Sequence, residues 1–180
     1  QFIKNLVLVW VGNLLGIVVG IVLLTGAQLF TSGVSPDVAD SIRHLAEIKA
    51  NDLTTMQIFF RGILCNILVC AAVLMAMCAK DITGKLLASF FVIMLFVTGG
   101  FEHCVANMYY ITAGLLALSN PGYVEQAIQA YGFSVEYLET LNVANFLIKN
   151  LLPVTIGNII GGAFFIGAPV YYLNCEKVKQ

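Results

Sequence analysis

The chain has 180 residues, of which 59% are hydrophobic and 11% are charged, with a mean hydropathy of +0.90 and a formal net charge of −1. Several apolar stretches exceed the about 20 residues that cross a hydrocarbon core of about 30 Å. The near-neutral charge does not supply the basic surface that nucleic-acid binding requires. These values predict a multi-pass protein of the inner or plasma membrane, surrounded by the lipid bilayer, with no nucleic-acid partner.

Four apolar stretches are separated by polar segments, and they cover about residues 6–30, 56–79, 86–118 and 151–173. The first connection, 31–55, contains a predicted short amphipathic helix over 42–48. The connection after residue 118 carries acids but no base before Lys149. Lys80 and Lys85 lie in the tight turn between the second and third stretches, so the positive-inside rule places this turn in the cytoplasm.

The five cysteines show neither a C-x-x-C motif nor a paired spacing. Most of them lie within the apolar stretches, where a cysteine behaves as a small apolar residue. We therefore expect buried packing residues at Cys65, Cys70, Cys78, Cys104 and Cys175.

The third apolar stretch carries an acid and a histidine in its middle, Glu102 and His103. Insertion scales give a charged side chain at the centre of a membrane helix a cost of about 2.5–3.5 kcal/mol. Such residues normally face a cavity or a partner and mark a pathway through the membrane. This pair therefore predicts a functional site near the bilayer midplane.

Two glycines, Gly99 and Gly100, directly precede this pair, and each weakens a helix by about 1 kcal/mol. We predict a membrane helix that is broken here, with one half ending near Val97 and the next starting near Phe101. The second half would direct its free N–H groups and its positive dipole end towards the midplane. Such a half-helix end favours an anion, so the break is a predicted anion site.

An internal repeat relates residues 3–16 to residues 148–161 at a constant offset of 145 positions, with eight of the fourteen aligned residues identical. A shared membrane composition alone would not keep the Lys-Asn pair and the Gly-Asn pair in register. The offset spans three crossings, so the copies are expected to run in opposite directions, as in the inverted repeats of transport proteins. On this interpretation residues 1–180 form a single transmembrane domain with four of six spans, and two helices precede residue 1.

Glycines recur every four residues in both copies of the repeat. Stripes of small residues allow membrane helices to approach each other closely. We therefore expect close helix packing, without any indication of a substrate, along Gly12, Gly16, Gly20, Gly157 and Gly161.

With these residues laid out, the chain resembles the formate/nitrite transporter family. The resemblance rests on KNLVLVWVGNLLG at 4–16, RGILCN at 61–66, GFEHCVANM at 100–108 and LPVTIGNIIGG at 152–162. It implies an all-α membrane protein with an aquaporin-like inverted-repeat bundle and a broken pore helix. It also implies a homopentamer with one pore in each protomer, and passage of small monovalent anions such as formate, nitrite or hydrosulfide.

The resemblance implies roles for individual residues as well. The family's central histidine falls on His103, and its pore-lining asparagines fall on Asn66 and Asn107. The constriction phenylalanine falls on Phe96, and the basic residue of the outer vestibule falls on Lys49. The family's first broken helix, with its gating loop and the threonine opposite the histidine, has no counterpart in these residues, so those roles are not assigned.

The residues at the break have a chemical interpretation of their own. A neutral imidazole at His103 can donate a hydrogen bond to an anion or exchange a proton with a weak acid, and the alternative is a core histidine satisfied by a neighbour. Glu102 is expected to support the structure, because a carboxylate in the pore would repel an anion while an acid in the first helical turn is stabilised by backbone N–H groups. Gly99 and Gly100 are expected to support the break itself.

For the other candidates two interpretations remain open. Asn66 and Asn107 either line the pore or link helices, because an amide without a partner in an apolar helix is costly. Phe96 either forms an apolar constriction or simply packs. Lys49 either concentrates anions at the pore mouth or is a solvated loop residue. Arg61 is expected to extend towards the interface or to pair with an acid.

Two classes of function follow from these residues. The first is a channel or transporter for small monovalent anions, with proton coupling through the central histidine as an option. The second is a membrane-embedded redox or metal enzyme that uses His103 and Cys104. We favour the first and expect no enzymatic activity, cofactor or metal, because the spans contain one histidine and the sequence has no nucleotide or quinone motif. We also expect residues 1–180 alone not to conduct, because an upstream broken helix would be needed to complete the pore.

Overall fold

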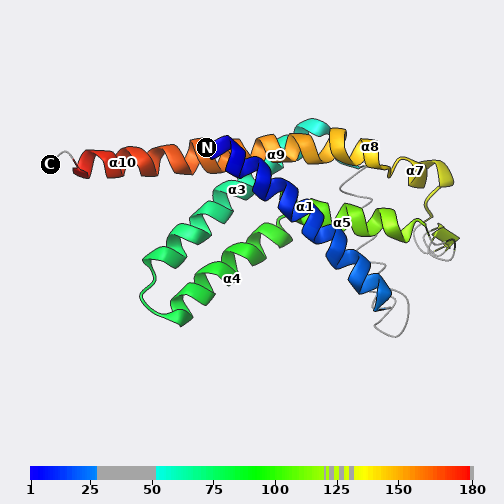
Figure 1. The fold of residues 1–180 in the computed structure, drawn as a ribbon, viewed down its shortest axis with the longest axis horizontal. Helices are drawn as coiled ribbons and strands as arrows, with labels where there is room; N and C mark the ends of the chain where they lie inside the picture. Colours follow the sequence, from blue (N-terminus) through cyan, green and yellow to red (C-terminus); the bar gives the residue numbers. More distant parts are fainter. Residues whose placement is uncertain (28–51, 120, 122–123, 126–127, 130–131, 179–180) are drawn as a thin grey trace. The chain divides into compact units, whose positions relative to one another are not determined.

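The computed structural model of the chain describes residues 1–27, 52–119, 121, 124–125, 128–129 and 132–178. Within these ranges the regular elements are all helical (Figure 1). The chain divides into two compact units. One unit comprises Gln1–Thr54 and Val105–Leu151, and the other comprises Thr55–Cys104 and Leu152–Gln180.

The first unit contains one long apolar helix and several shorter elements. They are α1 (Phe2–Gly26), most of α5 (Cys104–Ala117), α7 (Val135–Glu139), α8 (Val143–Asn145) and the π-helical η2 (Phe146–Leu151). Ser134 caps α7 by accepting a hydrogen bond from the Tyr137 backbone N–H at 3.1 Å, and Asn142 caps α8 in the same way. The buried apolar residues of this unit are Ile21, Met108, Ile111, Ala113, Leu138, Leu141, Phe146 and Leu151.

The second unit is built on a hairpin of two helices and a third helical segment that crosses it. Its elements are α3 (Thr55–Cys78), α4 (Ile82–Thr98), α9 (Leu152–Ile159), the π-helical η3 (Ile160–Gly167) and α10 (Ala168–Val178). The hairpin of α3 and α4 is visible in Figure 1. Asp81 begins α4, because its side chain accepts a hydrogen bond from the Gly84 N–H at 2.7 Å. The turn expected over 80–85 is therefore shorter than predicted, because α4 begins at Ile82 and already contains Lys85.

Helix α3 crosses α9 and η3 at very short range, and three glycines permit it. A Cβ added to Gly157 would overlap the Phe59 carbonyl oxygen, and one added to Gly161 would overlap the Ile63 carbonyl oxygen. On α3, a Cβ at Gly62 would lie 3.1 Å from the Val154 carbonyl oxygen. The backbones thus meet directly, as the small-residue stripe predicts for this copy of the repeat.

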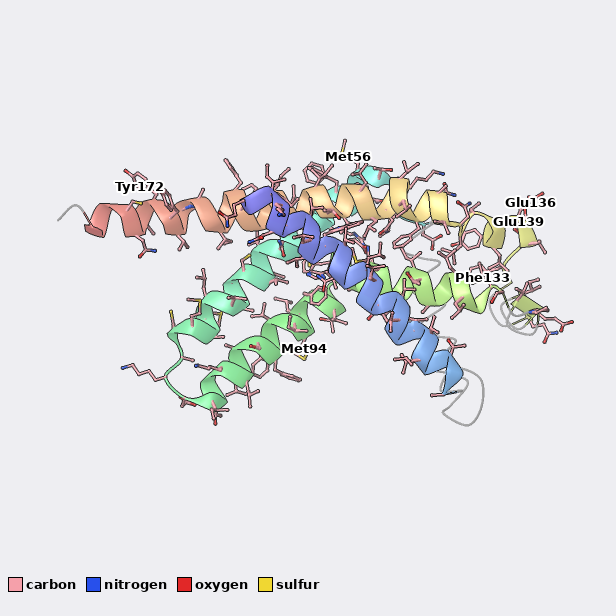
Figure 2. All side chains as sticks on the ribbon, in the orientation of Figure 1. Met56, Met94, Phe133, Glu136, Glu139 and Tyr172 are labelled. Atoms are coloured by element: carbon pink, nitrogen blue, oxygen red, sulfur yellow. The ribbon has the colours of Figure 1, made fainter. Side chains whose placement is uncertain are left out.

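Large apolar side chains cover the outside of these helices. Met94 on α4 and Tyr172 on α10 extend away from their helices in Figure 2, with 45% and 63% of their surfaces exposed. Lipid is the solvent in which such a surface is stable, because the hydrocarbon core is as apolar as the side chains. Among the described residues, three helical segments are long and apolar enough to cross a membrane, namely Ile3–Gly26, Thr55–Cys78 and Val143–Cys175.

Some sequence-based boundaries and one burial prediction need correction. Helix α1 begins and ends about four residues before the predicted span, and the last helical segment begins at Val143 instead of near residue 151. The earlier starts arise because the polar residues before these stretches continue the helix, which hydropathy alone does not register. Among the cysteines, Cys65 is buried, but Cys78 at the end of α3 is exposed, so uniform burial was wrong.

Candidate functional site

The break in the third apolar stretch is a helix end of a defined type. Helix α4 ends at Thr98, and Gly100 follows in the left-handed region with φ of 65°. The Phe101 N–H donates to the Phe96 carbonyl at 3.2 Å, and the Gly100 N–H donates to the Val97 carbonyl at 3.2 Å. These two bonds and the left-handed glycine define a Schellman motif, which satisfies carbonyls that the ending helix leaves open.

Gly99 is needed at the break for a steric reason. A Cβ on this residue would lie 2.8 Å from Cε2 of the Phe101 ring and 2.9 Å from the Leu95 carbonyl oxygen. The predicted break is therefore confirmed, but it is longer than expected. Helix α5 begins at Cys104 instead of near Phe101, so Glu102 precedes the first helical turn and does not lie in it.

Asn158 of α9 bonds to the residues at the C-terminal end of the break, where α5 begins. Its Nδ2 donates to the carbonyl oxygens of Gly62 and Glu102, both at 2.9 Å, and its Oδ1 accepts from the Cys104 N–H at 2.9 Å. The side chain is 4% exposed. Asn158 thus serves as the N-cap of α5 from a different helix. The Cys104 N–H is consequently occupied, although the sequence suggested that the first N–H groups of this half-helix would face an anion.

Arg61 and Asn66, both on α3, also bond to this region. The Arg61 Nη1 donates to the Gly100 carbonyl at 3.2 Å, and the Arg61 carbonyl accepts from the Glu102 N–H at 3.5 Å. Arg61 therefore binds the backbone of the break, a contact that the sequence did not indicate. Asn66 Nδ2 donates to the Asn158 carbonyl at 2.5 Å. The π-helical η3 begins two residues after Asn158, whose carbonyl accepts this bond from another helix.

His103 lies in the segment that joins α4 to α5 along the chain, beside Phe96. Their ring centroids are 6.0 Å apart with an interplanar angle of 58°, and both side chains are half-buried. Glu102 is 1% exposed, and its backbone N–H and carbonyl bond to α3 and α9 as described above. The structure thus places the imidazole beside an aromatic ring, while the amide of Asn66 in the same unit bonds to the Asn158 carbonyl.

The two remaining candidates, Asn107 and Lys49, do not lie among the described residues of the second unit. Asn107 belongs to the first unit, where it is fully buried and donates from Nδ2 to Asn150 Oδ1 at 2.8 Å. This bond joins α5 to η2, which is the arrangement of the helix-linking interpretation. Lys49 and the predicted amphipathic helix over 42–48 lie outside the described residues.

Sequence reasoning singled out neither Asn158 nor Arg61 as part of the site. In the sequence, Asn158 is half of the repeated Gly-Asn pair, and Arg61 is a charge near the end of a span. The repeat was the available signal for Asn158, because a polar residue kept in register inside an apolar helix requires a partner. No local signal points from Arg61 to a carbonyl that lies 39 residues further along the chain.

The described elements define a class of protein: a multi-pass helical membrane protein in which one span is broken at a polar site. The sequence profile of the formate/nitrite transporter family matches residues 1–172. The chain belongs to the formate/nitrite transporter family. This confirms the family resemblance, and the helical membrane bundle expected from it agrees with the solved structures described next.

Named relatives and solved structures are similar over nearly the whole chain. The formate channel FocA of Haemophilus influenzae is 37% identical in an alignment 178 residues long, which covers 97% of this chain and 60% of that protein. The formate channel FocB of Escherichia coli is 35% identical over 90% of this chain and 56% of its own length. A solved pentameric formate channel with formate bound has a TM-score of 0.81 at 30% identity, covering 96% of this chain and 66% of that one.

The chain therefore spans about 60% of the length of these curated relatives. The relatives carry the names of channels and transporters, so the alternative of a redox or metal enzyme using His103 and Cys104 is set aside. In the described part of the chain, no three His, Cys, Asp or Glu side chains gather into a group that could hold a metal ion.

Proposed function

We propose that the protein carries small monovalent anions of the formate type across the membrane, with His103 at the central polar site. The observation that carries this proposal is the broken span, which leaves an imidazole between two half-helices in a chain of the formate/nitrite transporter family. Irregular backbone within a membrane is stable only where protein or a cavity surrounds it. A break at this depth is thus the expected place for a substrate pathway.

His103 is the proposed contact to the anion. A neutral imidazole offers one N–H donor, which can bond a carboxylate oxygen of formate. The same ring can accept a proton or return one, so a weak acid such as formic acid can exchange its proton during passage. The proposed proton coupling therefore depends on His103 alone.

Phe96 is proposed as the apolar constriction next to this contact, since its ring lies 6.0 Å from the imidazole. A hydrophobic constriction excludes hydrated ions, because they do not shed water against an apolar ring. Asn66, whose amide already bonds α9, and Asn107, whose amide bonds Asn150, are proposed to fix the walls around the pathway. Lys49 is proposed to raise the local anion concentration at the outer mouth.

The proposed assembly is a homopentamer with one pathway in each protomer, and each span is proposed to lie in a single transmembrane domain. The solved pentameric formate channel with formate bound supports this arrangement, as does the apolar outer surface of the helices. Nitrite and hydrosulfide are proposed as further substrates, because each is a small monovalent anion that can accept one hydrogen bond from His103.

The test is anion flux into liposomes that contain the purified complete protein. Formate, nitrite and hydrosulfide are compared with sulfate, a larger divalent anion, and with protein-free liposomes. Formate flux well above that of sulfate supports the proposal, and equal leakage of all anions contradicts it. Parallel measurement of internal pH separates proton-coupled transport from passive flow, because coupled transport acidifies the liposome lumen.

A further inference from the structure

We propose that Asn158 is the positioning residue for His103, and that its carboxamide fixes the two peptide groups that flank this histidine. The inference rests on the function proposed above. Asn158 donates to the carbonyl of Glu102, the residue before His103, and accepts from the N–H of Cys104, the residue after it, each at 2.9 Å.

These two bonds determine the backbone at His103. A peptide group is planar, so holding the Glu102 carbonyl also orients the His103 nitrogen. Holding the Cys104 N–H likewise orients the His103 carbonyl carbon. With both planes fixed, the φ and ψ angles of His103 are fixed, and so is the direction in which its Cβ leaves the backbone. The imidazole therefore starts from a defined point at the break.

Asn158 itself is held firmly enough to perform this task. Its own carbonyl accepts from Asn66 Nδ2, and the neighbouring Gly157 brings α9 against the α3 backbone. The second N–H of its amide donates to the Gly62 carbonyl at 2.9 Å. A site is more precise when its supporting residues stand on rigid, packed helices, and this one does.

The same bonds make Asn158 a poor ligand for an anion. A primary amide has two N–H donors, and both are directed at carbonyl oxygens, those of Gly62 and Glu102. The side chain is also 4% exposed. Asn158 therefore acts through His103 and does not contact the transported anion.

Asn158→Asp is the sharpest variant, because it keeps the size and the acceptor but replaces both donors. An ionised carboxylate would retain the bond from the Cys104 N–H and would face two carbonyl oxygens without a proton to share. Protonation restores one donor. The ratio of variant flux to parent flux should therefore rise as the pH falls, which loss of packing alone would not produce.

Asn174→Asp is the matched control. Asn174 lies on α10, is exposed, and donates from Nδ2 to the Val170 carbonyl at 2.8 Å within its own helix. The substitution makes the same chemical change on the same helical segment, away from the break. Any general effect of an added carboxylate on expression or on liposome incorporation appears in this variant as well.

The experiment compares formate flux for the parent protein, Asn158→Asp and Asn174→Asp between about pH 5 and pH 7, after sizing in detergent. We expect Asn174→Asp to match the parent and Asn158→Asp to lose about tenfold or more near neutrality, because a misplaced binding group costs this much or more. The ratio to the parent should recover towards acid. A flux ratio for Asn158→Asp that equals that of Asn174→Asp across the range would overturn the proposal.

A second readout does not depend on transport. In ¹⁵N-histidine spectra, assigned by the signal lost in His103→Phe, the imidazole of His103 should show one set of shifts in the parent and several or broadened signals in Asn158→Asp. Unchanged signals would contradict the positioning role. An absence of formate flux in the parent, with altered signals in Asn158→Asp, would reject the proposed function and keep the positioning role.

If Asn158→Asp does not survive extraction, Asn158→Ser takes its place. A serine hydroxyl supplies one donor and is smaller, so it leaves the α3 crossing unobstructed. We expect an intermediate loss of flux and partial broadening of the imidazole signals. Parental flux together with parental signals would overturn the proposal.

Discussion

The two copies of the internal repeat share eight of fourteen aligned residues but have different surroundings. In the second copy, Gly161 lies against the Ile63 backbone, and Asn158 and Asn150 are buried and hydrogen-bonded. In the first copy, no described atom of its unit lies within 4 Å of a Cβ added to Gly16.

The aligned asparagines differ in the same way. Asn5, which matches Asn150, is exposed, and Asn13, which matches Asn158, is half-buried. A glycine stripe and an in-register asparagine therefore record a capacity for close packing and hydrogen bonding. Whether that capacity is used depends on which helix lies opposite, and this differs between the two copies.

The largest expected effect is a difference in folding between leucine variants of Gly161 and Gly16. Gly161→Leu should abolish the folded protein, because the added side chain would have to displace the Ile63 carbonyl, and overpacking of this kind costs about 1–3 kcal/mol or more. Gly16→Leu should leave folding intact. The measurement is the oligomer peak in detergent sizing together with the melting temperature. Equal loss in both variants would mean that the α1 glycines pack against a segment outside the described residues.

His103→Phe separates the role of the break in transport from the role of the helix crossing in assembly. The helices remain packed through Gly157 and Gly161, so assembly should be normal, while formate flux should fall by about a hundredfold because the polar contact is gone. His103→Asn should be milder, since an amide still donates a hydrogen bond, but the pH dependence of flux should flatten. Flux of His103→Phe equal to that of the parent in liposomes would reject the central role of this histidine.

The asparagine pair at the other end of the repeat should show a smaller contrast. Asn150→Ala leaves the buried amide of Asn107 without its acceptor, which costs about 1–3 kcal/mol. Asn5→Ala changes an exposed residue and should stay within about 0.5 kcal/mol of the parent. Thermal unfolding in detergent measures both. Indistinguishable melting temperatures would show that the Asn107–Asn150 bond contributes nothing net.

The smallest effect concerns the left-handed glycine of the break. Gly100→Ala should cost about 1–2 kcal/mol, because an alanine does not readily adopt φ of 65°. Gly132→Ala is the control, because Gly132 has a φ of 68° with open space around it, so an alanine there introduces the same backbone strain outside the break. Both variants should lose similar stability, but only Gly100→Ala should also reduce formate flux. Reduced flux in both would assign the effect to general strain.

The sequence by itself determined the membrane class, the helical fold, the family and the existence of the break. These follow from local properties, because apolar length fixes what can cross a bilayer and paired glycines beside ionisable residues disfavour a continuous helix. The length of the break did not follow. Helix α5 begins only at Cys104, because its N-cap is supplied by Asn158 from 54 residues away.

Only the tertiary structure decided which polar residues hold the break and which copy of the repeat uses its glycines. Asn158 and Arg61 donate hydrogen bonds to the backbone carbonyls of Gly62, Glu102 and Gly100. A backbone carbonyl that accepts such a bond is not marked by any residue type in the sequence. Every residue has a carbonyl, so composition and spacing do not single out an acceptor. The packing of α9 on α3 determines which backbone groups are bonded, because it brings the Asn158 amide within 2.9 Å of three of them.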